Sequence, residues 1–353
     1  MEEEMNLQET VGRIRPLDEK SMEEAKRHWD SIAHPLHSLG KLEDVLVAIA
    51  GMNGRPDVRL DKKALVVMCA DNGIVEEGVT QSGQEVTAIV SENFLNEKAT
   101  AAILCRECGA DIFPVDIGVA RDTILINRKI AYGTKNFAKE PAMTREETIR
   151  ALEVGISMAQ ELKEKGYQIL ATGEMGIGNT TTSSAVASVL LGRNPIEMTG
   201  RGAGLSSEGL RRKIRTIETG IRLHQPDPSD AVDVLSKVGG FDIAGMAGVF
   251  LGGAALGIPV VMDGFISSVA ALAAARIAPQ ALPYMVPSHC SKEPAAHLIL
   301  EALGKEPFLT CDMCLGEGTG AVALFPLLSM ACAVYHSMST FVENSMEEYK
   351  PLV

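Results

Sequence analysis

The amino-acid sequence predicts an α/β fold, a parallel sheet covered by helices on both faces in the Rossmann-like manner. Four short apolar runs bounded by turn residues are of the type that is buried on both faces of such a sheet. Helical patterns separate these runs, as expected of β–helix–β units. The chain has 353 residues, 33 of them glycine, and only 4% aromatic residues. This composition favours helices packed closely on the sheet, and the length favours two domains.

The predicted strands end at polar or glycine residues. They cover KKALVVMCAD at 62–71, ADIFPVDIG at 110–118, YQILATG at 167–173 and IPVVMDG at 258–264. Asp71, Asp116 and Asp263 stand at or near three of these ends. Ligands of open parallel sheets bind beyond the carboxyl ends of the strands, so we expect the chemistry at this edge.

Two helical segments near the ends of the chain have no strand partner in this pattern. Residues 17–50 carry apolar residues at helical spacing, and a last apolar helix covers about 322–342. We therefore expect two domains. Residues 1–55 with 322–353 would form a small helical domain, and residues 56–321 a large catalytic α/β domain.

One apolar stretch, residues 243–262, contains no charged residue and is long enough to span a membrane. It also contains several glycines and a proline, and an aspartate stands directly on each side of it. We interpret it as a buried helix that ends at Leu256, a stop at Gly257 and a short strand. Gly51 is expected to end the earlier helical run in the same way. No membrane association is expected.

Charge and cysteine content indicate the cellular setting. The net charge of −13 argues against general binding of nucleic acid, which needs clustered Lys and Arg. Seven cysteines, an odd number, argue against a disulfide framework. The acidic start of the chain lacks a signal-peptide pattern. We expect a cytoplasmic protein.

Two Cys-x-x-Cys pairs, Cys105/Cys108 and Cys311/Cys314, have a spacing found among zinc ligands. However, about 200 residues separate the pairs, and the first falls in a helical pattern. We interpret that pair as core or half-buried cysteines and expect no metal site.

A glycine cluster, GEMGIGNTTT at 173–182, follows a predicted strand and opens a helix. It has the P-loop pattern, with Asn179 where the lysine is expected. Glycines let backbone N–H groups converge on a phosphate, and the helix N-terminus adds a positive dipole. The missing lysine favours a monophosphate over a nucleoside triphosphate. A tight turn with a helix cap is the alternative, but Glu174 fits it poorly, because a carboxylate there needs another task.

Two further glycine-rich segments carry candidate residues. TGRGAGLSSEGLRRK at 199–213 ends in Lys213, which is a candidate for the same phosphate, although a solvated basic helix face is the preferred interpretation of an isolated charge run. LGEGTGA at 315–321 matches a dinucleotide fingerprint only weakly. Glu317 is more informative, because a carboxylate between glycines beside an apolar helix suits a general base. An exposed loop glutamate is the alternative.

Together these motifs resemble the nicotinate-nucleotide–dimethylbenzimidazole phosphoribosyltransferase family, which makes the lower-ligand nucleotide of cobalamin. The similarity runs from SLGKLE at 38–43 to AVALFPLLSMA at 321–331. Its landmarks are VMCADNGIVEEGVT (67–80), GEMGIGNTTT (173–182), VVMDGFISSVAAL (260–272), PSHCSKEP (287–294) and LGEGTGA (315–321).

The resemblance implies transfer of 5-phosphoribose from nicotinate mononucleotide to a nitrogen of 5,6-dimethylbenzimidazole or a similar base, with release of nicotinate and without a cofactor. It implies that Glu317 is the general base and that Glu174 lies beside it. A homodimer is implied, with a heterodimer of two related chains as the alternative.

The resemblance also implies the remaining site residues. The phosphate and nucleotide site falls on Gly176, Gly178, Asn179, Thr180, Gly202, Gly204, Lys213, Asp263, Gly264 and Ser291. The acceptor pocket involves Thr80, Met175 and Leu315.

Some residues depart from the family pattern and leave alternatives open. Asn72 stands where the family commonly has histidine, and the residues after Thr80 do not specify one acceptor. Relatives that use phenolic or purine acceptors are therefore an alternative. A non-catalytic nucleotide-binding subunit is a second, and the presence of both Glu174 and Glu317 argues against it.

Overall fold

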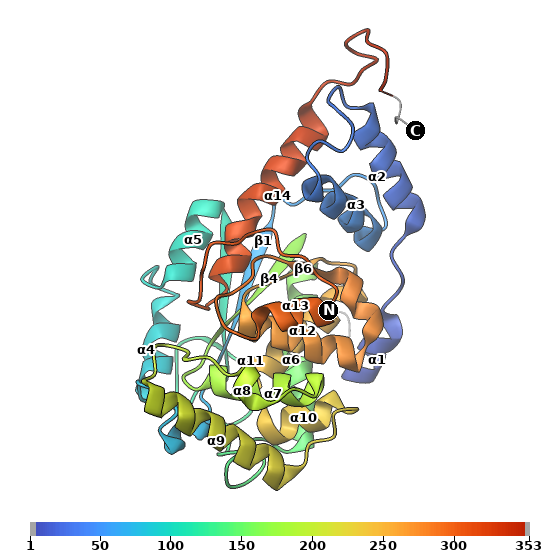
Figure 1. The fold of residues 1–353 in the computed structure, drawn as a ribbon. Helices are drawn as coiled ribbons and strands as arrows, with labels where there is room; N and C mark the ends of the chain where they lie inside the picture. Colours follow the sequence, from blue (N-terminus) through green and yellow to red (C-terminus); the bar gives the residue numbers. More distant parts are fainter. Residues whose placement is uncertain (1–4, 350–353) are drawn as a thin grey trace.

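A six-stranded parallel sheet forms the centre of the computed structural model, which describes residues 5–349 (Figure 1). The strand order is β3-β2-β1-β4-β5-β6, and every pair is parallel. The strands are β1 (Lys63–Ala70), β2 (Ala110–Gly118), β3 (Ile126–Asn127), β4 (Ile169–Met175), β5 (Val260–Met262) and β6 (Met285–Pro287). The predicted parallel α/β fold is confirmed.

The sheet changes direction between β1 and β4. The chain leaves β1 toward β2 on one side and returns to β4 on the other, so these two strands lie next to each other. All eight residues of β1 are buried, which is why this run is apolar throughout. In parallel sheets of this kind, the crevice beyond the carboxyl ends at such a switch point is the usual ligand site.

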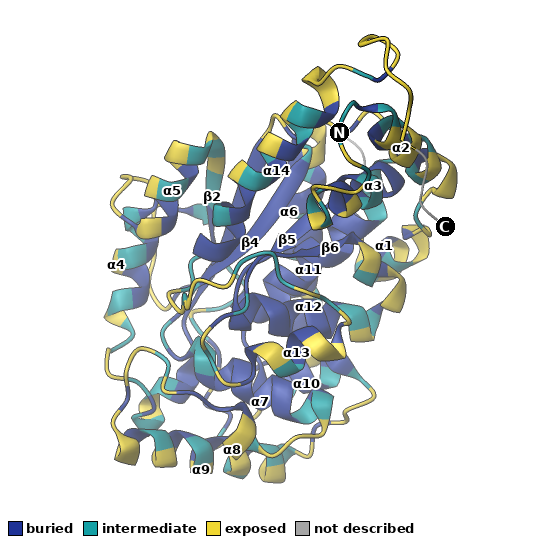
Figure 2. Ribbon diagram, turned by 45° about the horizontal axis from the view of Figure 1, so that its top comes forward, coloured by how far each residue is buried: buried dark blue, intermediate teal, exposed yellow. Residues whose placement is uncertain are grey.

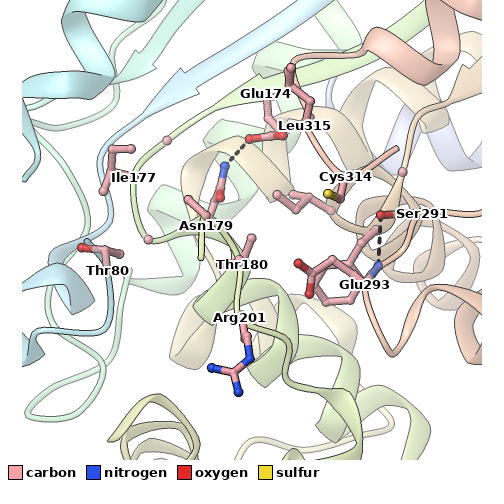
Figure 3. A pocket seen from close by; sticks show the side chains of 18 of the residues that line it. Thr80, Glu174, Ile177, Asn179, Thr180, Arg201, Ser291, Glu293, Cys314 and Leu315 are labelled. Carbon is pink, nitrogen blue, oxygen red and sulfur yellow. Dashed lines mark hydrogen bonds between the residues drawn. The ribbon is translucent and has the colours of Figure 1, made fainter. Parts of the chain in front are cut away.

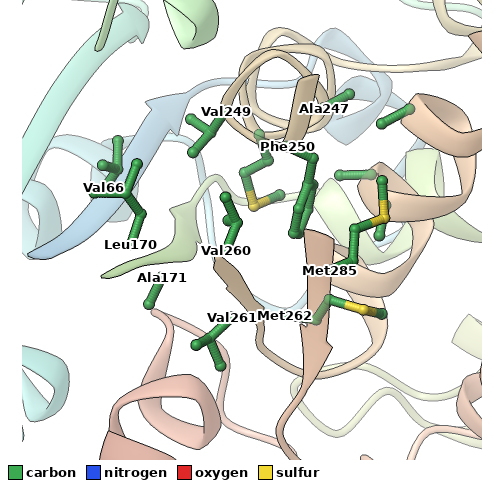
Figure 4. Close-up of a cluster of buried hydrophobic side chains, with 14 of the residues drawn as sticks. Val66, Leu170, Ala171, Ala247, Val249, Phe250, Val260, Val261, Met262 and Met285 are labelled. Carbon is green, nitrogen blue, oxygen red and sulfur yellow. The ribbon is translucent and has the colours of Figure 1, made fainter. Parts of the chain in front are cut away.

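Helices cover both faces of the sheet (Figure 2). On one face lie α11 (Phe241–Leu256) and α12 (Phe265–Ile277), with α6 (Arg145–Glu164) packed outside α11. The other face carries α4 (Glu85–Asn93), α5 (Thr100–Cys108) and α14 (Thr319–Ser337). Figure 4 shows aliphatic and methionine side chains of β4, β5 and β6 packed together with those of α11.

The other helices lie around these layers. They are α1 (Leu7–Arg13), α2 (Glu19–Ser31), α3 (Lys41–Asn53), α7 (Asn179–Leu191), α8 (Pro195–Met198), α9 (Ser207–His224), α10 (Ala231–Val238), α13 (Ala296–Ala302) and the 3₁₀ helices η1 (Gly73–Glu77) and η2 (Pro279–Tyr284).

Segments from both ends of the chain pack together, as Figure 1 shows for α2, α3 and α14. An antiparallel bridge joins Ile32 to Thr340, and the ring of Tyr335 lies edge-on to that of Trp29 with centroids 5.0 Å apart. In contrast, α1 packs on α6 and α11. The division into two domains stays a prediction, and part of its C-terminal boundary lies outside the described residues.

Some local predictions were wrong. The helical run predicted over 17–50 is two helices separated by residues 32–40. Gly51 does not end the second helix, which continues to Asn53, and Gly54 caps it with a left-handed φ of 65°. Strands β3 and β6 were not predicted, because runs of two or three residues carry no periodic signal.

The apolar stretch 243–262 folds as predicted, into all but the first two residues of α11, a left-handed Gly257 and β5. A different helix, α14, is long and apolar enough to cross a membrane by length and composition alone. Half of its most apolar window is buried, and α14 packs against α3, α5 and β4. Its apolar side chains therefore have partners within this fold.

Glycines set the separation of α6 and α11. A Cβ on Gly248 would lie 1.9 Å from the carbonyl oxygen of Leu152. We expect Gly248→Ala to lower the free energy of unfolding by about 1–3 kcal/mol, because the helices must move apart. Gly12 in α1 provides the control, because a Cβ added there would have no heavy atom within 4 Å. Gly12→Ala is expected to be neutral or stabilising by about 0.5–1 kcal/mol. Equal urea midpoints for the two variants would contradict this close packing.

Candidate functional site

A cavity of about 250 Å³ opens beyond the carboxyl ends of β4 and β5 (Figure 3). Loops from distant parts of the sequence line it together. They are residues 79–82, 174–180, 201–203, 205, 263–266, 289, 291, 293 and 314–317, with Lys213 of α9. The cavity therefore occupies the edge at which the sequence analysis places the chemistry.

Glu174 is a buried carboxylate near the end of β4, with 5% of its surface exposed. Its carboxylate accepts hydrogen bonds from the side-chain amide of Asn179 and from the backbone N–H of Glu317. Burial raises the pKa of Glu174 well above its usual range, and the carboxylates of Asp242, Asp263 and Glu317 raise it further. The residue connects the start of α7 with the loop before α14.

Glu317 is a half-buried carboxylate in the turn before α14. Its Oε2 accepts a hydrogen bond of 3.1 Å from the backbone N–H of Ala101, in the first turn of α5. Burial raises the pKa of Glu317, and the charge of Asp263 adds to this, while hydrogen bonds from the backbone of Ala101 and Thr100 oppose it. A carboxylate with a raised pKa at a cavity wall can accept a proton near neutral pH.

Lys213 is a buried cation in the same cavity, with 1% of its surface exposed. Its Nζ donates hydrogen bonds to Oγ1 of Thr180, at 2.8 Å, and to the carbonyl of Gly200, at 3.3 Å. Burial lowers the pKa of Lys213 to about 8, although the carboxylate of Glu293 opposes this shift. Thr180 lies in the first turn of α7, so the cation and the helix N-terminus together favour an anion.

The cavity has one further cation and an apolar wall. The guanidinium of Arg201 donates hydrogen bonds to the carbonyl of Leu205, at 2.7 Å, and to Oγ of Ser207, at 3.1 Å. On the opposite side from Arg201 lie Glu174 and Leu315 (Figure 3). Leu315 is 56% exposed, which leaves an apolar surface free to contact a ligand ring.

Comparison with known proteins decides the family. A family model described as "Phosphoribosyltransferase" matches residues 14–346. The chain is 49% identical over 350 residues to the nicotinate-nucleotide–dimethylbenzimidazole phosphoribosyltransferase of Acetivibrio thermocellus, a match that covers 98% of this chain and 100% of the relative. The chain belongs to the nicotinate-nucleotide–dimethylbenzimidazole phosphoribosyltransferase family.

Other relatives agree. The protein of the same name from Ruminiclostridium cellulolyticum is 49% identical over 351 residues, which is 99% of this chain and 100% of that protein. The crystal structure of CobT from Thermus thermophilus superposes with a TM-score of 0.88 at 38% identity and covers 94% of this chain and 100% of that chain. The resemblance found in the sequence is therefore confirmed.

The structure brings almost all of the predicted site residues to one cavity. The lining includes Thr80, Glu174, Met175, Gly176, Gly178, Asn179, Thr180, Gly202, Lys213, Asp263, Gly264, Ser291, Leu315 and Glu317. Gly204 does not line it, and its carbonyl instead accepts a hydrogen bond from the side chain of Gln81. The individual roles of these residues stay predictions.

Two residues of the predicted phosphate site, Asn179 and Lys213, have surroundings that the sequence did not predict. The side chain of Asn179 is bound to Glu174, and its backbone N–H donates to the carbonyl of Gly176 at 3.0 Å. The preferred interpretation of the basic run was wrong for Lys213, which is buried in the cavity, whereas Arg211 and Arg212 beside it are exposed.

Sequence reasoning missed several residues of the lining. The largest omissions are Gln81, Arg201, His289 and Glu293. His289 and Glu293 lie in the same family landmark as Ser291, and Arg201 lies between two glycines of the predicted strip. The available signal was therefore a charged or ring side chain within two residues of a predicted glycine or serine, which covers Arg201, His289 and Glu293 but not Gln81.

Asn72, which departs from the family pattern, is held by hydrogen bonds beside the glycine turn. It is fully buried, and its side-chain amide donates to the carbonyl of Ile177 at 3.5 Å. Burial raises the pKa of Asp242 to about 7, and hydrogen bonds from the backbone of Ile243 and the side chain of Asn72 limit this rise. Asn72 therefore supports the glycine turn between β4 and α7 from below the cavity.

The two Cys-x-x-Cys pairs differ in how far they are buried. Cys105 is buried and Cys108 half-buried on α5, as predicted, whereas Cys311 and Cys314 are exposed. Among residues 5–349, no group of three or more His, Cys, Asp or Glu side chains could hold a metal ion. Cys314 does line the cavity.

The lowered pKa of Lys213 predicts how anion binding varies with pH. Below about 8 the amine is charged, and above it the amine is neutral. A sugar phosphate is almost fully ionised above pH 7, because its second pKa is about 6. We therefore expect the Kd for ribose 5-phosphate, measured by calorimetry, to rise between about pH 7 and pH 9.

In the Lys213→Met variant the Kd is expected to be higher and to lose this pH dependence. Arg211→Met, on the exposed side of α9, is the matched control and should retain it. A pH dependence that survives in Lys213→Met would assign the titration to another group.

Proposed function

We propose that this chain transfers 5-phosphoribose from nicotinate mononucleotide to a nitrogen of 5,6-dimethylbenzimidazole or a similar base and releases nicotinate. The observation that carries the proposal is the pairing, in one cavity, of a buried cation at a helix N-terminus with a carboxylate of raised pKa. Lys213 provides the cation and Glu317 the carboxylate. Membership of the family, and the names of its relatives, support the same reaction.

The phosphate end of the substrate belongs at Lys213 and the start of α7. The ammonium group of Lys213, which donates a hydrogen bond to Oγ1 of Thr180, would also donate one to the phosphate. Backbone N–H groups in the glycine turn and the dipole of α7 supply further attraction. Holding both reactants in one geometry can supply about 7–11 kcal/mol of the barrier reduction.

The chemical step is a displacement at C1′ of the ribose. The unprotonated nitrogen of the base forms a bond to C1′ while the bond from C1′ to the pyridinium nitrogen breaks, and its electron pair stays with nicotinate. The leaving group needs no proton, because its ring nitrogen already carries the positive charge. The base becomes a cation and loses the proton from its other nitrogen.

Glu317 takes that proton. Its raised pKa makes it a better base toward an azole cation than an ordinary glutamate, and a positioned base typically contributes about 10²–10⁴-fold to the rate. We give Glu174 a different role, because it is 5% exposed whereas Glu317 is half-buried, and because its carboxylate joins the side chain of Asn179 to the backbone of Glu317. Glu174 holds the two loops together.

The acceptor ring belongs against the apolar part of the lining. Thr80, Met175 and Leu315 line the cavity there, together with Ile177 (Figure 3). Side chains of this kind grip a flat ring by shape and apolar contact. They select less strictly among acceptors than a set of hydrogen bonds would.

The proposed reaction is tested with a panel of acceptors. Incubation with nicotinate mononucleotide and 5,6-dimethylbenzimidazole, benzimidazole, adenine or phenol is expected to give the highest kcat/KM with the benzimidazoles, measured by chromatography of the products. Higher turnover with phenol or adenine would favour the relatives with those acceptors. Binding of nicotinate mononucleotide without any product would favour a non-catalytic subunit.

Glu317→Gln tests the base. The amide keeps the size of the side chain but accepts no proton, so we expect kcat to fall by at least ~10²-fold. The Kd for nicotinate mononucleotide should stay within about threefold, because the phosphate site is intact. Near-normal turnover would remove Glu317 from this role.

We also propose a cytoplasmic homodimer. Exposed apolar side chains lie in the second half of α14 and in the segment directly after it, namely Met330, Met338 and Val342. A second copy of the chain would cover them. Sedimentation of the purified chain tests this. A monomer that associates only with a related chain would favour the heterodimer.

A further inference from the structure

Asp263 makes an unusual set of contacts directly after β5. The residue is 4% exposed. Its Oδ1 accepts hydrogen bonds from the backbone N–H groups of Gly320, at 2.7 Å, and Ala321, at 3.1 Å. Its Oδ2 accepts one from Gly318 at 3.2 Å. Three backbone donors therefore converge on one carboxylate.

These donors belong to the start of α14. The first N–H groups of a helix have no partner within the helix, and they are usually satisfied by the side chain of the N-cap residue. Gly318 is the N-cap here and has no side chain. Asp263 supplies the missing acceptor from a distant part of the sequence, and its charge also suits the positive end of the helix dipole.

The capped turn fixes Glu317, the residue just before Gly318. Glu317 has a left-handed φ of 63°, which residues other than glycine adopt only when their surroundings hold them there. Its backbone carbonyl packs on β4, where a Cβ on Gly173 would lie 2.4 Å from it. Its side chain then reaches Ala101. A shift of the turn would move the carboxylate.

We propose that Asp263 is the positioning residue for Glu317, acting by capping α14, and that it does not hold the nucleotide. The inference rests on the proposed function, since it concerns the base of that reaction. Oδ1 already accepts two N–H groups and Oδ2 one, and Nε2 of His289 lies 3.6 Å from Oδ1. A nucleotide hydroxyl could therefore reach only the remaining lone pair of Oδ2, on a residue that is 4% exposed.

A double-mutant cycle tests the inference. Asp263→Asn keeps one acceptor but loses the charge, and we expect kcat to fall at least ~10-fold while KM for nicotinate mononucleotide stays within about threefold. In the Glu317→Gln background, Asp263→Asn should lower kcat by less than about threefold, because the base is already absent. Additive losses, or a raised KM with kcat unchanged, would overturn the proposal in favour of direct contact with the nucleotide.

A pH profile gives a readout that loss of a helix cap alone would not move. The charged groups facing Glu317 are Asp263 after β5 and Glu174 on β4, and the first-turn N–H groups of α5 face it from the other side. Removal of the Asp263 charge alone lowers the pKa of Glu317, whereas loss of the hydrogen bond from Ala101, which a shifted turn entails, raises that pKa by more. The acidic limb of kcat/KM should therefore move to higher pH in Asp263→Asn. An unmoved limb, or one that moves to lower pH as the lost charge alone dictates, would contradict the proposal.

Asp230→Asn is the matched control, because Asp230 caps α10 through the N–H groups of Val232 and Asp233. It should leave the acidic limb in place. A crystal structure of Asp263→Asn adds a test that needs no activity. The hydrogen bond from Ala101 to Glu317 is expected to be lost, and its retention would overturn the proposal. Absence of turnover in the unmodified chain would count against the proposed reaction alone.

Discussion

The parallel pairing of β4 with β1 on one side and β5 on the other is the constraint on which the site depends. It brings the carboxyl ends of three strands to one edge, so that Glu174 and Asp263 lie close together although they are far apart in the sequence. The turn before α14 then packs over the end of β4, where Gly173 leaves room for the backbone of Glu317. The strand pairing therefore fixes the turn before α14, and the turn fixes the position of Glu317.

Burial of several carboxylates at this edge has an electrostatic cost, which the fold reduces with backbone hydrogen bonds. Glu317 receives N–H groups of α5, and Asp263 receives three from α14. What remains is a raised pKa at Glu174 and Glu317. The net charge of −13 opposes the approach of an anionic substrate. Capture must then depend on short-range features, namely the start of α7, Lys213 and Arg201 at the rim.

The sequence was sufficient for the long, apolar elements and for residues within family landmarks. Strands β1, β2, β4 and β5 and the turn at Gly257 follow from local pattern, because burial on both faces dictates their composition. The break between α2 and α3, and the short β3 and β6, depend on contacts with other parts of the chain. The burial of Lys213 and the capping of α14 by Asp263 are likewise tertiary facts. No spacing in the sequence connects Asp263 with Gly320.

A crystal structure of the chain with nicotinate mononucleotide, without acceptor, tests the central claim most directly. The account predicts a phosphate oxygen within about 3.2 Å of Nζ of Lys213. It also predicts that C1′ faces the carboxylate of Glu317 and that no ligand atom is bound to Asp263. A phosphate bound away from Lys213 and the start of α7, or a ribose turned away from Glu317, would contradict it.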